Sequence, residues 1–294
     1  MSSDLFGFKS LAKIGQGAAS DIHLVQDQKT KQIWTLKHVV RRTEKDDRFI
    51  QQVEDEFAIG KRLDHPNIRA TIDVFRKKKL FRTIEIGLLL EYVDAGSIDQ
   101  RMPKSQLEAT KIFSQVARGL AHMHDRGFVH ADMKPTNVMV ADGTVKVIDL
   151  GQACPIGTVK KRIQGTPGYM APEQAHREAI TPATDIYNFG ATMYWVLMGE
   201  VIPTAMPPKD EQSGLYKGAI ERERIPIPVA PHERNPSIHH LLSKQVIECI
   251  QVDPAARPQS MERVATRLEL IADLIAHPIG SRDFSSDEES RSDG

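Results

Sequence analysis

The run between His130 and Gly151 constrains this chain more than any other stretch. It reads HADMKPTNVMVADGTVKVIDLG. Two apolar segments, NVMV and TVKVID, are separated by Ala-Asp-Gly, which is a turn sequence, so the run predicts a β-hairpin. Because a hairpin brings its two ends together, we expect Asn137 beside Asp149, with Asp132 on the loop that enters the first strand.

The polar residues that this hairpin would gather have a specific chemistry. Two carboxylates (Asp132 and Asp149), the amide of Asn137 and the ammonium of Lys134 suit a metal-bound phosphate and a hydroxyl that is directed toward it. The same residue types are ordinary in turns, so the hairpin alone also fits a charged surface feature. The rest of the chain has to decide between these two interpretations.

Composition narrows the class of protein. The chain has 294 residues, enough for two lobes with a core. Lys+Arg and Asp+Glu number 39 each, so no overall charge attracts the chain to nucleic acid or to an anionic membrane. The two cysteines, Cys154 and Cys249, form neither a disulfide framework nor a metal-site spacing. No apolar run approaches the ~20 residues that span a bilayer. We therefore expect a soluble, cytoplasmic protein without membrane insertion.

The first forty residues predict three strands, over residues 8–14, 22–25 and 33–40. The turn between the first two contains Gly15 and Gly17, where backbone N–H groups can approach a phosphate without an obstructing Cβ. Lys37 lies on the third predicted strand, within reach of the same phosphate. Each signal is weak by itself, because flexible hairpins and solvated lysines are common.

A helix is predicted next, from apolar residues at three- and four-residue spacing at Ile50, Val53 and Phe57. Glu56 lies on the inward face of this helix and is the expected partner of Lys37. Gly60 is unusual, because glycine inside a helix costs about 1 kcal/mol relative to alanine. We expect the helix to end near residues 65–67, which read His-Pro-Asn.

The remainder of the chain predicts two further strands and then mainly helices. The strands fall at residues 71–75 and 83–90, and a lobe boundary is placed after residue 92. A helix that is apolar on all sides, over residues 185–197, should form the core of the second lobe. Residues 152–165 lack periodicity and predict a loop. The last fifteen residues hold five serines and five acidic residues, so we expect an acidic, Ser-rich disordered tail over 278–294.

Taken together and in order, these motifs resemble the eukaryotic-type (Hanks-type) serine/threonine protein kinase family over residues 8–272. The segment GTPGYMAPEQ is similar to bacterial members. The resemblance implies an α+β, bilobal protein-kinase fold. Its N-lobe, residues 1–92, would be a small antiparallel β-sheet with one main helix, and its C-lobe, residues 93–277, would be larger and helical.

The resemblance also implies roles for the polar cluster. The catalytic positions of the family fall on Lys37, Glu56, Asp132, Lys134 and Thr166, and its metal positions on Asn137 and Asp149. Asp132 would accept or orient the proton of the attacking hydroxyl, and Lys134 would neutralise charge on the transferred phosphoryl group. Lys37, braced by Glu56, would fix the α- and β-phosphates. Lys134 and the Gly-Thr-Pro sequence are similar to the serine/threonine branch.

Nucleotide-binding positions follow from the same resemblance. They fall on Ile14, Gly15, Gly17, Ser20, Ile22, Thr35, Lys37, Leu90, Glu91, Val93, Ser97 and Met139. Leu90 looks like the gatekeeper, and the backbone of residues 91–93 would hold the adenine edge. The segment 171–173 (Ala-Pro-Glu) and Arg257 look like the pair that ties the substrate-side loop to the C-lobe, and Asp185 matches the anchor beneath the catalytic loop.

Two linked departures concern activation. Ala131 replaces the arginine of His-Arg-Asp, which docks a phosphate on the activation loop in other members. Arg162 stands four residues before Thr166, at the usual phosphoacceptor position, and cannot be phosphorylated. We therefore predict that activity does not rely on phosphorylation of this loop. Thr158 is the one hydroxyl left in the loop before Thr166.

Other departures concern the nucleotide and the substrate. Ser20 replaces the third loop glycine, and Thr35 replaces an alanine, which would crowd the nucleotide slightly. Gly60 stands where the family has a bulky apolar residue, which predicts a looser helix and a Lys37–Glu56 pair formed only part of the time. Thr136 stands where members directed to basic substrates often have an acid, which argues against a strict arginine-directed motif.

The sequence thus predicts an enzyme that uses ATP and Mg²⁺ (or Mn²⁺) to phosphorylate serine and threonine in protein substrates, including itself. A regulatory protein is a further possible partner, and no nucleic acid is expected. Two alternatives stay open. A pseudokinase scaffold or binding module is kept open by Ala131, Ser20 and Gly60. A small-molecule kinase of similar fold is disfavoured by the Gly-Thr-Pro and Ala-Pro-Glu segments, which serve protein-substrate docking.

Overall fold

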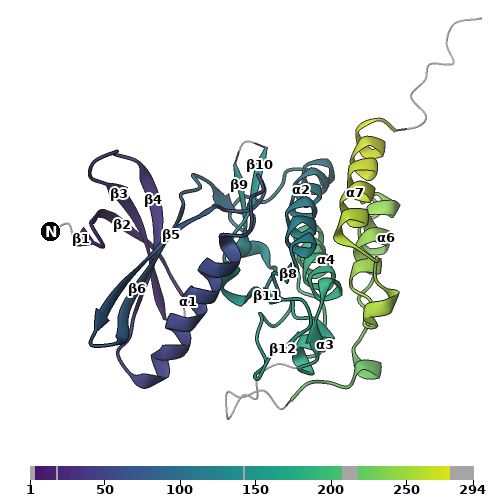
Figure 1. Cartoon of the computed structure of the whole chain (residues 1–294). Helices are drawn as coiled ribbons and strands as arrows, with labels where there is room; N and C mark the ends of the chain where they lie inside the picture. The colour runs from purple at the N-terminus through teal and green to yellow at the C-terminus, as the bar shows by residue number, and fades with distance from the viewer. Residues whose placement is uncertain (1–3, 18, 142, 207–217, 279–294) are drawn as a thin grey trace, which may run out of the picture.

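A computed structural model describes residues 4–17, 19–141, 143–206 and 218–278 of the protein. An antiparallel sheet with one long helix forms the N-terminal lobe, and a mainly helical C-terminal lobe follows it (Figure 1). This arrangement confirms the expected bilobal α+β fold. Of the predicted tail, residues 279–294 lie outside the described residues.

Six strands form the N-lobe sheet. They are β1 (Asp4–Leu5), β2 (Phe8–Gln16), β3 (Ser20–Asp27), β4 (Ile33–Val40), β5 (Thr71–Lys79) and β6 (Arg82–Glu91). Their order is β1-β2-β3-β4-β6-β5, and every pair is antiparallel. Successive side chains on a strand point to opposite faces. On β6, Leu88 and Leu90 therefore pack in the cluster with helix α1, and Leu89 packs on the other side with Val25 and Leu36.

Helix α1 (Asp47–Gly60) ends five residues earlier than predicted. The chain turns directly after it, with Leu63 N donating to Gly60 O at 3.1 Å. Gly60 is therefore the last helical residue and not an interior one. A Cβ at this position would lie 2.1 Å from Oγ1 of Thr71, the first residue of β5. The glycine is required because α1 ends against a neighbouring strand, and that contact is not visible in the local sequence.

We predict that Gly60→Ala destabilises the protein by about 1–3 kcal/mol, because the added methyl group overpacks the contact with Thr71. Helix propensity alone predicts the opposite sign. Urea unfolding followed by circular dichroism measures the change. The double variant Gly60→Ala/Thr71→Ala should recover part of the loss, because it removes the nearest clashing atom. A Gly60→Ala protein that is more stable than the parent would contradict the contact.

The C-lobe contains short strands and helices. Its strands are β7 (Gly96–Ser97), β8 (Phe128–Val129), β9 (Val138–Ala141), β10 (Thr144–Val147), β11 (Cys154–Pro155), β12 (Thr158–Val159) and β13 (Ala179–Ile180). Its α-helices are α2 (Gln106–Asp125), α3 (Pro172–Ala175), α4 (Pro182–Met198), α5 (Pro231–Arg234), α6 (His240–Cys249) and α7 (Met261–Ala276). Short 3₁₀ turns are η1 (Glu44–Asp46), η2 (Pro135–Asn137), η3 (Leu150–Gln152), η4 (Arg222–Arg224) and η5 (Pro254–Ala256).

The prediction of a plain loop over residues 152–165 was wrong in part. Strand β11 pairs with β8, and β12 pairs with β13. Each of these strands has two residues, which is too short to leave a periodic pattern in the sequence. Both pairings join segments that lie about 20 or more residues apart along the chain, so tertiary contacts decide them.

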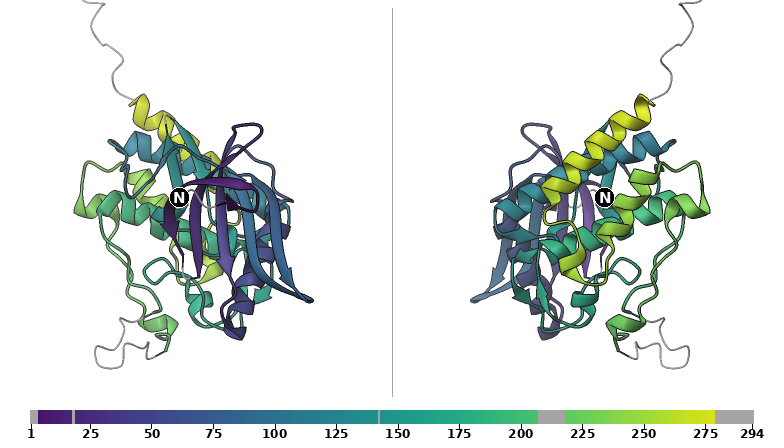
Figure 2. Two further views of the ribbon diagram at one scale, coloured as in Figure 1. Left: turned by 90° about the vertical axis from the view of Figure 1, so that its left-hand side faces the viewer. Right: turned by 90° about the vertical axis from the view of Figure 1, so that its right-hand side faces the viewer.

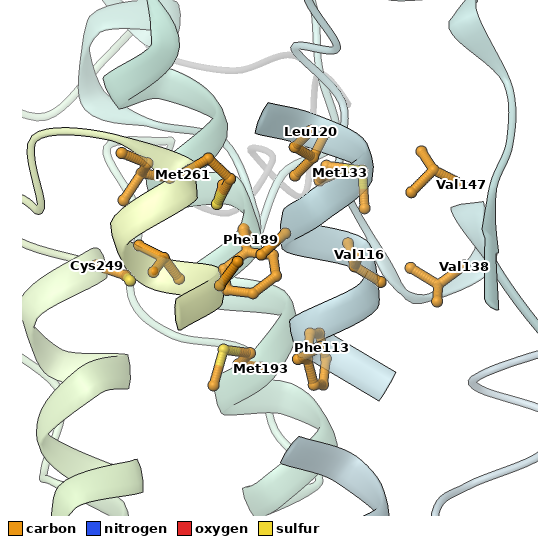
Figure 3. Close-up of a cluster of buried hydrophobic side chains, with 14 of the residues drawn as sticks. Phe113, Val116, Leu120, Met133, Val138, Val147, Phe189, Met193, Cys249 and Met261 are labelled. Atoms are coloured by element: carbon orange, nitrogen blue, oxygen red, sulfur yellow. The ribbon is translucent and has the colours of Figure 1, made fainter. Parts of the chain in front are cut away.

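Helices α2 and α4 enclose the main core (Figure 3). Ser105 caps α2, with its Oγ accepting from Glu108 N at 3.1 Å. The rings of Phe113 on α2 and Phe189 on α4 meet edge to face, with centroids 5.4 Å apart. Figure 3 shows Val138 and Val147 of the hairpin pointing toward α2 from its other side. The polar hairpin therefore stands on a buried apolar base.

Helix α7 runs across the outer side of α2 (Figure 2), where Arg118 of α2 forms ion pairs with Glu262 and Glu269 of α7. In the part of the chain that the structure describes, none of the helices is long and apolar enough to cross a membrane.

Candidate active site

The predicted hairpin is present. Strands β9 and β10 pair antiparallel, with Val138 opposite Val147. At its open end Ile148 N donates to Asn137 O at 3.0 Å, so Asn137 and Asp149 leave the hairpin side by side. Asp132 lies just before the first strand, and the Asn137 amide donates to its carbonyl oxygen at 2.9 Å.

Two side chains, Lys134 from the same loop and Thr166 from a second loop, meet at Asp132. Thr166 Oγ1 donates to Asp132 Oδ1 at 2.8 Å, and Lys134 Nζ lies 2.9 Å from Asp132 Oδ2. Lys134 Nζ also donates to Thr166 Oγ1 at 3.0 Å. The cluster therefore holds a carboxylate, an ammonium and a hydroxyl in one connected set. Thr166 occupies the position on Asp132 at which another hydroxyl could donate the same bond.

A fully buried carboxylate supports this loop from beneath. Asp185, on α4, accepts from the backbone N–H groups of His130 at 2.8 Å and Ala131 at 2.7 Å, and from His124 Nε2 at 2.8 Å. Burial raises the pKa of Asp185, but these hydrogen bonds and the nearby histidines outweigh it, so the pKa is lowered. The loop is also strained, because Ala131 has a φ of 60° and is not a glycine. Asp185 holds it in that conformation.

A second charged cluster joins the two lobes. Lys37 Nζ lies 2.7 Å from Glu56 Oε2 and 3.0 Å from Asp149 Oδ1, and the Glu56 side chain is 1% exposed. Burial alone would lower the pKa of the Lys37 ammonium, but the two carboxylates outweigh it and the pKa is raised. Lys37 therefore stays charged in this position.

The expectation of a partly formed Lys37–Glu56 pair does not hold in the structure, where the pair is closed. Two features explain it. Helix α1 is tied to the loop after Asp149 by Gln52, whose Nε2 donates to Gly151 O at 2.6 Å. An open pair would also leave the buried Glu56 carboxylate without its countercharge. Gln52 lies one turn before Glu56, on the same helix face, and that spacing is the sequence signal that the prediction missed.

Arg69 is a second residue that sequence reasoning missed. Burial lowers the pKa of its guanidinium, while Glu56, Asp149 and Glu91 oppose this effect. A small pocket behind the Lys37–Glu56 pair is lined by Glu56, Arg69, Thr71, Leu90, Val147, Ile148, Asp149 and Leu150. For Asp149, burial raises the pKa, but Lys37 and then Arg69 outweigh it and the pKa is lowered. The signal was a charged residue between the apolar residues Ile68 and Ala70, at the start of a strand sequence.

The predicted nucleotide positions come from both lobes. Ile14, Gly15 and Gly17 lie on or just after β2, Ser20 and Ile22 on β3, Thr35 and Lys37 on β4, Leu90 and Glu91 on β6, Val93 in the linker, Ser97 on β7 and Met139 on β9. Register brings them together in pairs, because Gly15 is opposite Ile22, Thr35 is opposite Leu90 and Ser97 is opposite Met139. Glu91 uses its side chain elsewhere, in an ion pair with Lys146 at 2.8 Å.

Arg257 and Glu173 form the most deeply buried ion pair among the described residues. Their side chains are 0% and 3% exposed, and two nitrogens of Arg257 donate to the carboxylate at 2.7 and 3.0 Å. The guanidinium also donates to three backbone carbonyl oxygens, of Gln251, Ala183 and Val252. This pair connects the start of α3 with the segment that precedes α7.

A family model described as the protein kinase domain matches residues 8–268. The chain belongs to the protein kinase family. It is 28% identical over 274 residues to the serine/threonine-protein kinase PknB of Mycobacterium leprae, which covers 89% of this chain and 41% of that protein. It is 31% identical over 208 residues to the human calcium/calmodulin-dependent protein kinase type IV, which covers 67% of this chain and 41% of that protein. The chain thus spans about two fifths of the length of these relatives.

The kinase domain joins its catalytic loop to its activation segment by a neutral side chain that the sequence analysis did not single out. Gln174 is 4% exposed, and its Nε2 donates to Ala131 O at 2.8 Å. Its Oε1 accepts from Ala171 N at 3.0 Å and from Asn188 Nδ2 at 2.9 Å. Ala131 is the position at which the family has its phosphate-docking arginine. In this chain the amide of Gln174 contacts the backbone of that position, and its signal was the glutamine directly after Ala-Pro-Glu.

The residues of this kinase domain fit a Mg²⁺ ion. Mg²⁺ prefers oxygen ligands and is commonly held by one or two carboxylates together with substrate phosphates and water. Asn137 uses its Nδ2 in the bond to Asp132 O, and Lys37 and Gly151 N contact only Oδ1 of Asp149. Within the described ranges, Asn137 Oδ1 and Asp149 Oδ2 therefore keep their lone pairs for a cation. The same part of the chain holds no group of three or more His, Cys, Asp or Glu side chains placed for a metal.

Proposed function

We propose that this kinase domain catalyses ATP-dependent phosphorylation of serine and threonine side chains in protein substrates, with Mg²⁺ or Mn²⁺ bound to the nucleotide. The observation that carries this proposal is the closed Lys37–Glu56 pair at 2.7 Å, which places Lys37 3.0 Å from Asp149. Phosphoryl transfer depends on positioning and electrostatic stabilisation, so an assembled set of charges is what the reaction requires. We propose residues 1–92 as the N-lobe and 93–277 as the C-lobe of this unit.

The side chains divide the work as follows. Asn137 and Asp149 would hold the metal ion, which supplies positive charge to the β- and γ-phosphate oxygens. Lys37 would contact the α- and β-phosphates, and Glu56 keeps it in place. The twelve nucleotide positions named above, from Ile14 to Met139, would surround the base, ribose and phosphates.

The substrate hydroxyl would take the place that Thr166 Oγ1 holds on Asp132, at 2.8 Å. Asp132 would then orient this hydroxyl and accept its proton, and Lys134, which contacts both Asp132 and Thr166, would stabilise the charge on the phosphoryl group. The Lys134–Thr166 hydrogen bond supports the assignment to serine and threonine, because the loop is held around an aliphatic hydroxyl.

Incubation of the protein with radiolabelled ATP and Mg²⁺, with and without a generic protein substrate, tests the proposal. We expect label on the substrate and on the protein itself, recovered as phosphoserine and phosphothreonine after acid hydrolysis. Label recovered as phosphotyrosine would contradict the assignment. A protein that binds ATP or partners but transfers no phosphate under any of these conditions would favour the pseudokinase alternative.

We further predict that activity does not rely on phosphorylation of the activation loop. The hydroxyl of Thr158 already donates to Pro155 O at 2.6 Å, and Thr158 pairs with Ile180 in the β12–β13 ladder. Thr158→Ala should therefore keep transfer within about twofold of the parent, and phosphatase treatment should leave the initial rate unchanged. Initial rates with a protein substrate measure both. A loss of more than tenfold in either case would overturn this prediction.

A further inference from the structure

A basic groove lies beside the activation segment and has no part in the chemistry described above. Its volume is about 550 Å³. Its charged residues are Lys161 and Arg162 on one wall and Arg177 on the other. His176 lies beside Arg177, and Gly218 is at the edge of the groove. Arg162 stands four residues before Thr166, which is bound to Asp132, so one wall of the groove belongs to the segment that leads to the place proposed for the substrate hydroxyl.

The walls of this groove are fixed. His176 Nε2 donates to Ile220 O at 3.1 Å, and Arg222 forms an ion pair with Glu178. Ala175, at the base, is 3% exposed. The wall that carries Arg177 is thus anchored to the segment that follows Gly218 by two separate contacts.

Among the described residues, no carboxylate pairs with the exposed cationic side chains of the groove. Lys161, Arg162 and Arg177 are exposed, and none of them forms an ion pair within the part of the chain that the structure describes. The nearby acids are engaged elsewhere, Glu173 with Arg257 and Glu178 with Arg222. The neighbouring Lys160 is also used differently, because its Nζ donates to Gln152 O at 3.0 Å.

Within the described residues, no carboxylate forms an ion pair with Arg162. In this position other members of the family carry a phosphoacceptor, and this chain has a cation there and alanine at position 131. A basic run on a loop can also be a solvated surface with no ligand. The groove differs from such a surface because cations from two segments, Lys161 and Arg162 on one and Arg177 on the other, face one shared hollow.

We propose that this groove binds acidic residues of the substrate chain, so that the enzyme prefers serine or threonine flanked by aspartate and glutamate. The proposal rests on the proposed kinase function and names the substrate class of that same site. Opposite charges at exposed sites contribute to selectivity and association rate more than to affinity. Thr136, in place of an acid before Asn137, agrees with a substrate that is not basic.

The chain itself contains a sequence of the required kind. Residues 284–289 read Phe-Ser-Ser-Asp-Glu-Glu, with two serines directly before three acidic residues. A synthetic peptide of residues 280–294 is therefore the natural probe. Its matched control has Asp287, Glu288 and Glu289 replaced by their amides, which keeps size and hydrogen bonding but removes three charges.

Steady-state transfer from ATP to both peptides tests the proposal. We expect kcat/KM for the acidic peptide to exceed that for the amide peptide by about tenfold, since each exposed charge pair contributes a factor of roughly two to five. The ratio should fall as the salt concentration rises. Equal kcat/KM for the two peptides would overturn the proposal.

Variants locate the effect. In Arg162→Gln/Arg177→Gln the ratio of acidic to amide peptide should fall to about two or less. The control Lys78→Gln/Lys79→Gln removes the same charge from the exposed β5–β6 end and should keep the parent ratio. Arg162→Glu/Arg177→Glu should instead prefer a peptide in which lysines replace residues 287–289. If the ratio changed equally in Lys78→Gln/Lys79→Gln, the preference would come from the overall charge of the protein and not from the groove. That result would overturn the assignment.

Fluorescence anisotropy with both labelled peptides separates this proposal from the proposed function. Tighter binding of the acidic peptide that is lost in Arg162→Gln/Arg177→Gln supports the groove, even if no phosphate is transferred. Transfer to both peptides without any difference in binding or rate supports the kinase function and overturns the groove.

Discussion

Replacing Asp149 with asparagine is expected to lower phosphate transfer by at least about 1,000-fold while the protein stays folded. The amide keeps the shape of the side chain but removes the proposed anionic ligand of the metal ion and one of the two anionic partners of Lys37. Metal-ion stabilisation of transition-state charge amounts to several kcal/mol, and each 1.4 kcal/mol corresponds to about tenfold in rate. The lowered pKa of Asp149 means that the parent carboxylate stays ionised in any ordinary assay buffer.

Single-turnover transfer from radiolabelled ATP measures this effect, and circular dichroism confirms that the variant is folded. Asp64→Asn is a matched control, because Asp64 is exposed and the hydrogen bond recorded there comes from its backbone N–H and not from its carboxylate. The control should transfer at the parental rate. If Asp149→Asn kept more than a tenth of the parental rate, the metal site would have to be assigned to other residues.

Replacing Arg257 with alanine is expected to reduce the free energy of unfolding by about 3–5 kcal/mol, the range found when one partner of a buried ion pair is removed. The change strands the Glu173 carboxylate, which is 3% exposed, and removes the donor to three backbone carbonyl oxygens. It also leaves the Tyr187 ring without the guanidinium that lies 4.9 Å from its centroid. The segment around α3 should loosen first, since Glu173 is its anchor.

Urea unfolding of Arg257→Ala, Glu173→Gln and the double variant gives the coupling energy of the pair. The double variant should be more stable than the sum of the two single losses predicts, because it leaves no buried charge without a partner. Arg267→Ala is the control. Its partner Glu248 is at 2.6 Å, but both side chains are at least a third exposed, so its loss should stay below about 1 kcal/mol. Equal losses in Arg257→Ala and Arg267→Ala would contradict the expected difference between buried and exposed pairs.

Much of the site could be predicted because its signals are local. The β9–β10 hairpin follows from a turn sequence between two short apolar runs, and its register alone brings Asn137 and Asp149 together. Helix α4 was predicted from its apolar sides and begins at Pro182, three residues before Asp185. Family resemblance supplied Lys37 and Glu56, and the fold places them in contact.

The features that were missed depend on contacts between distant segments. The end of α1 at Gly60 is decided by its contact with Thr71 on another element. The sequence of residues 61–67 does not indicate that the helix has already ended. Closure of the Lys37–Glu56 pair involves Gln52 and Gly151, which are 99 residues apart. Gln174 reaches Ala131 over 43 residues. A glutamine in such a run has many possible partners, and only the folded chain selects one.

The Gln174 connection has a consequence for how such an enzyme could be controlled. An amide carries no charge at any pH, is not removed by a phosphatase and is little affected by salt. A kinase that relies on a docked phosphate stays active after the activating event, until the phosphate is hydrolysed. If activity does not rely on loop phosphorylation, as we propose, a domain held together by Gln174 and Asn188 would not retain its activation in this way. We expect its output to follow the momentary amounts of enzyme, nucleotide and substrate.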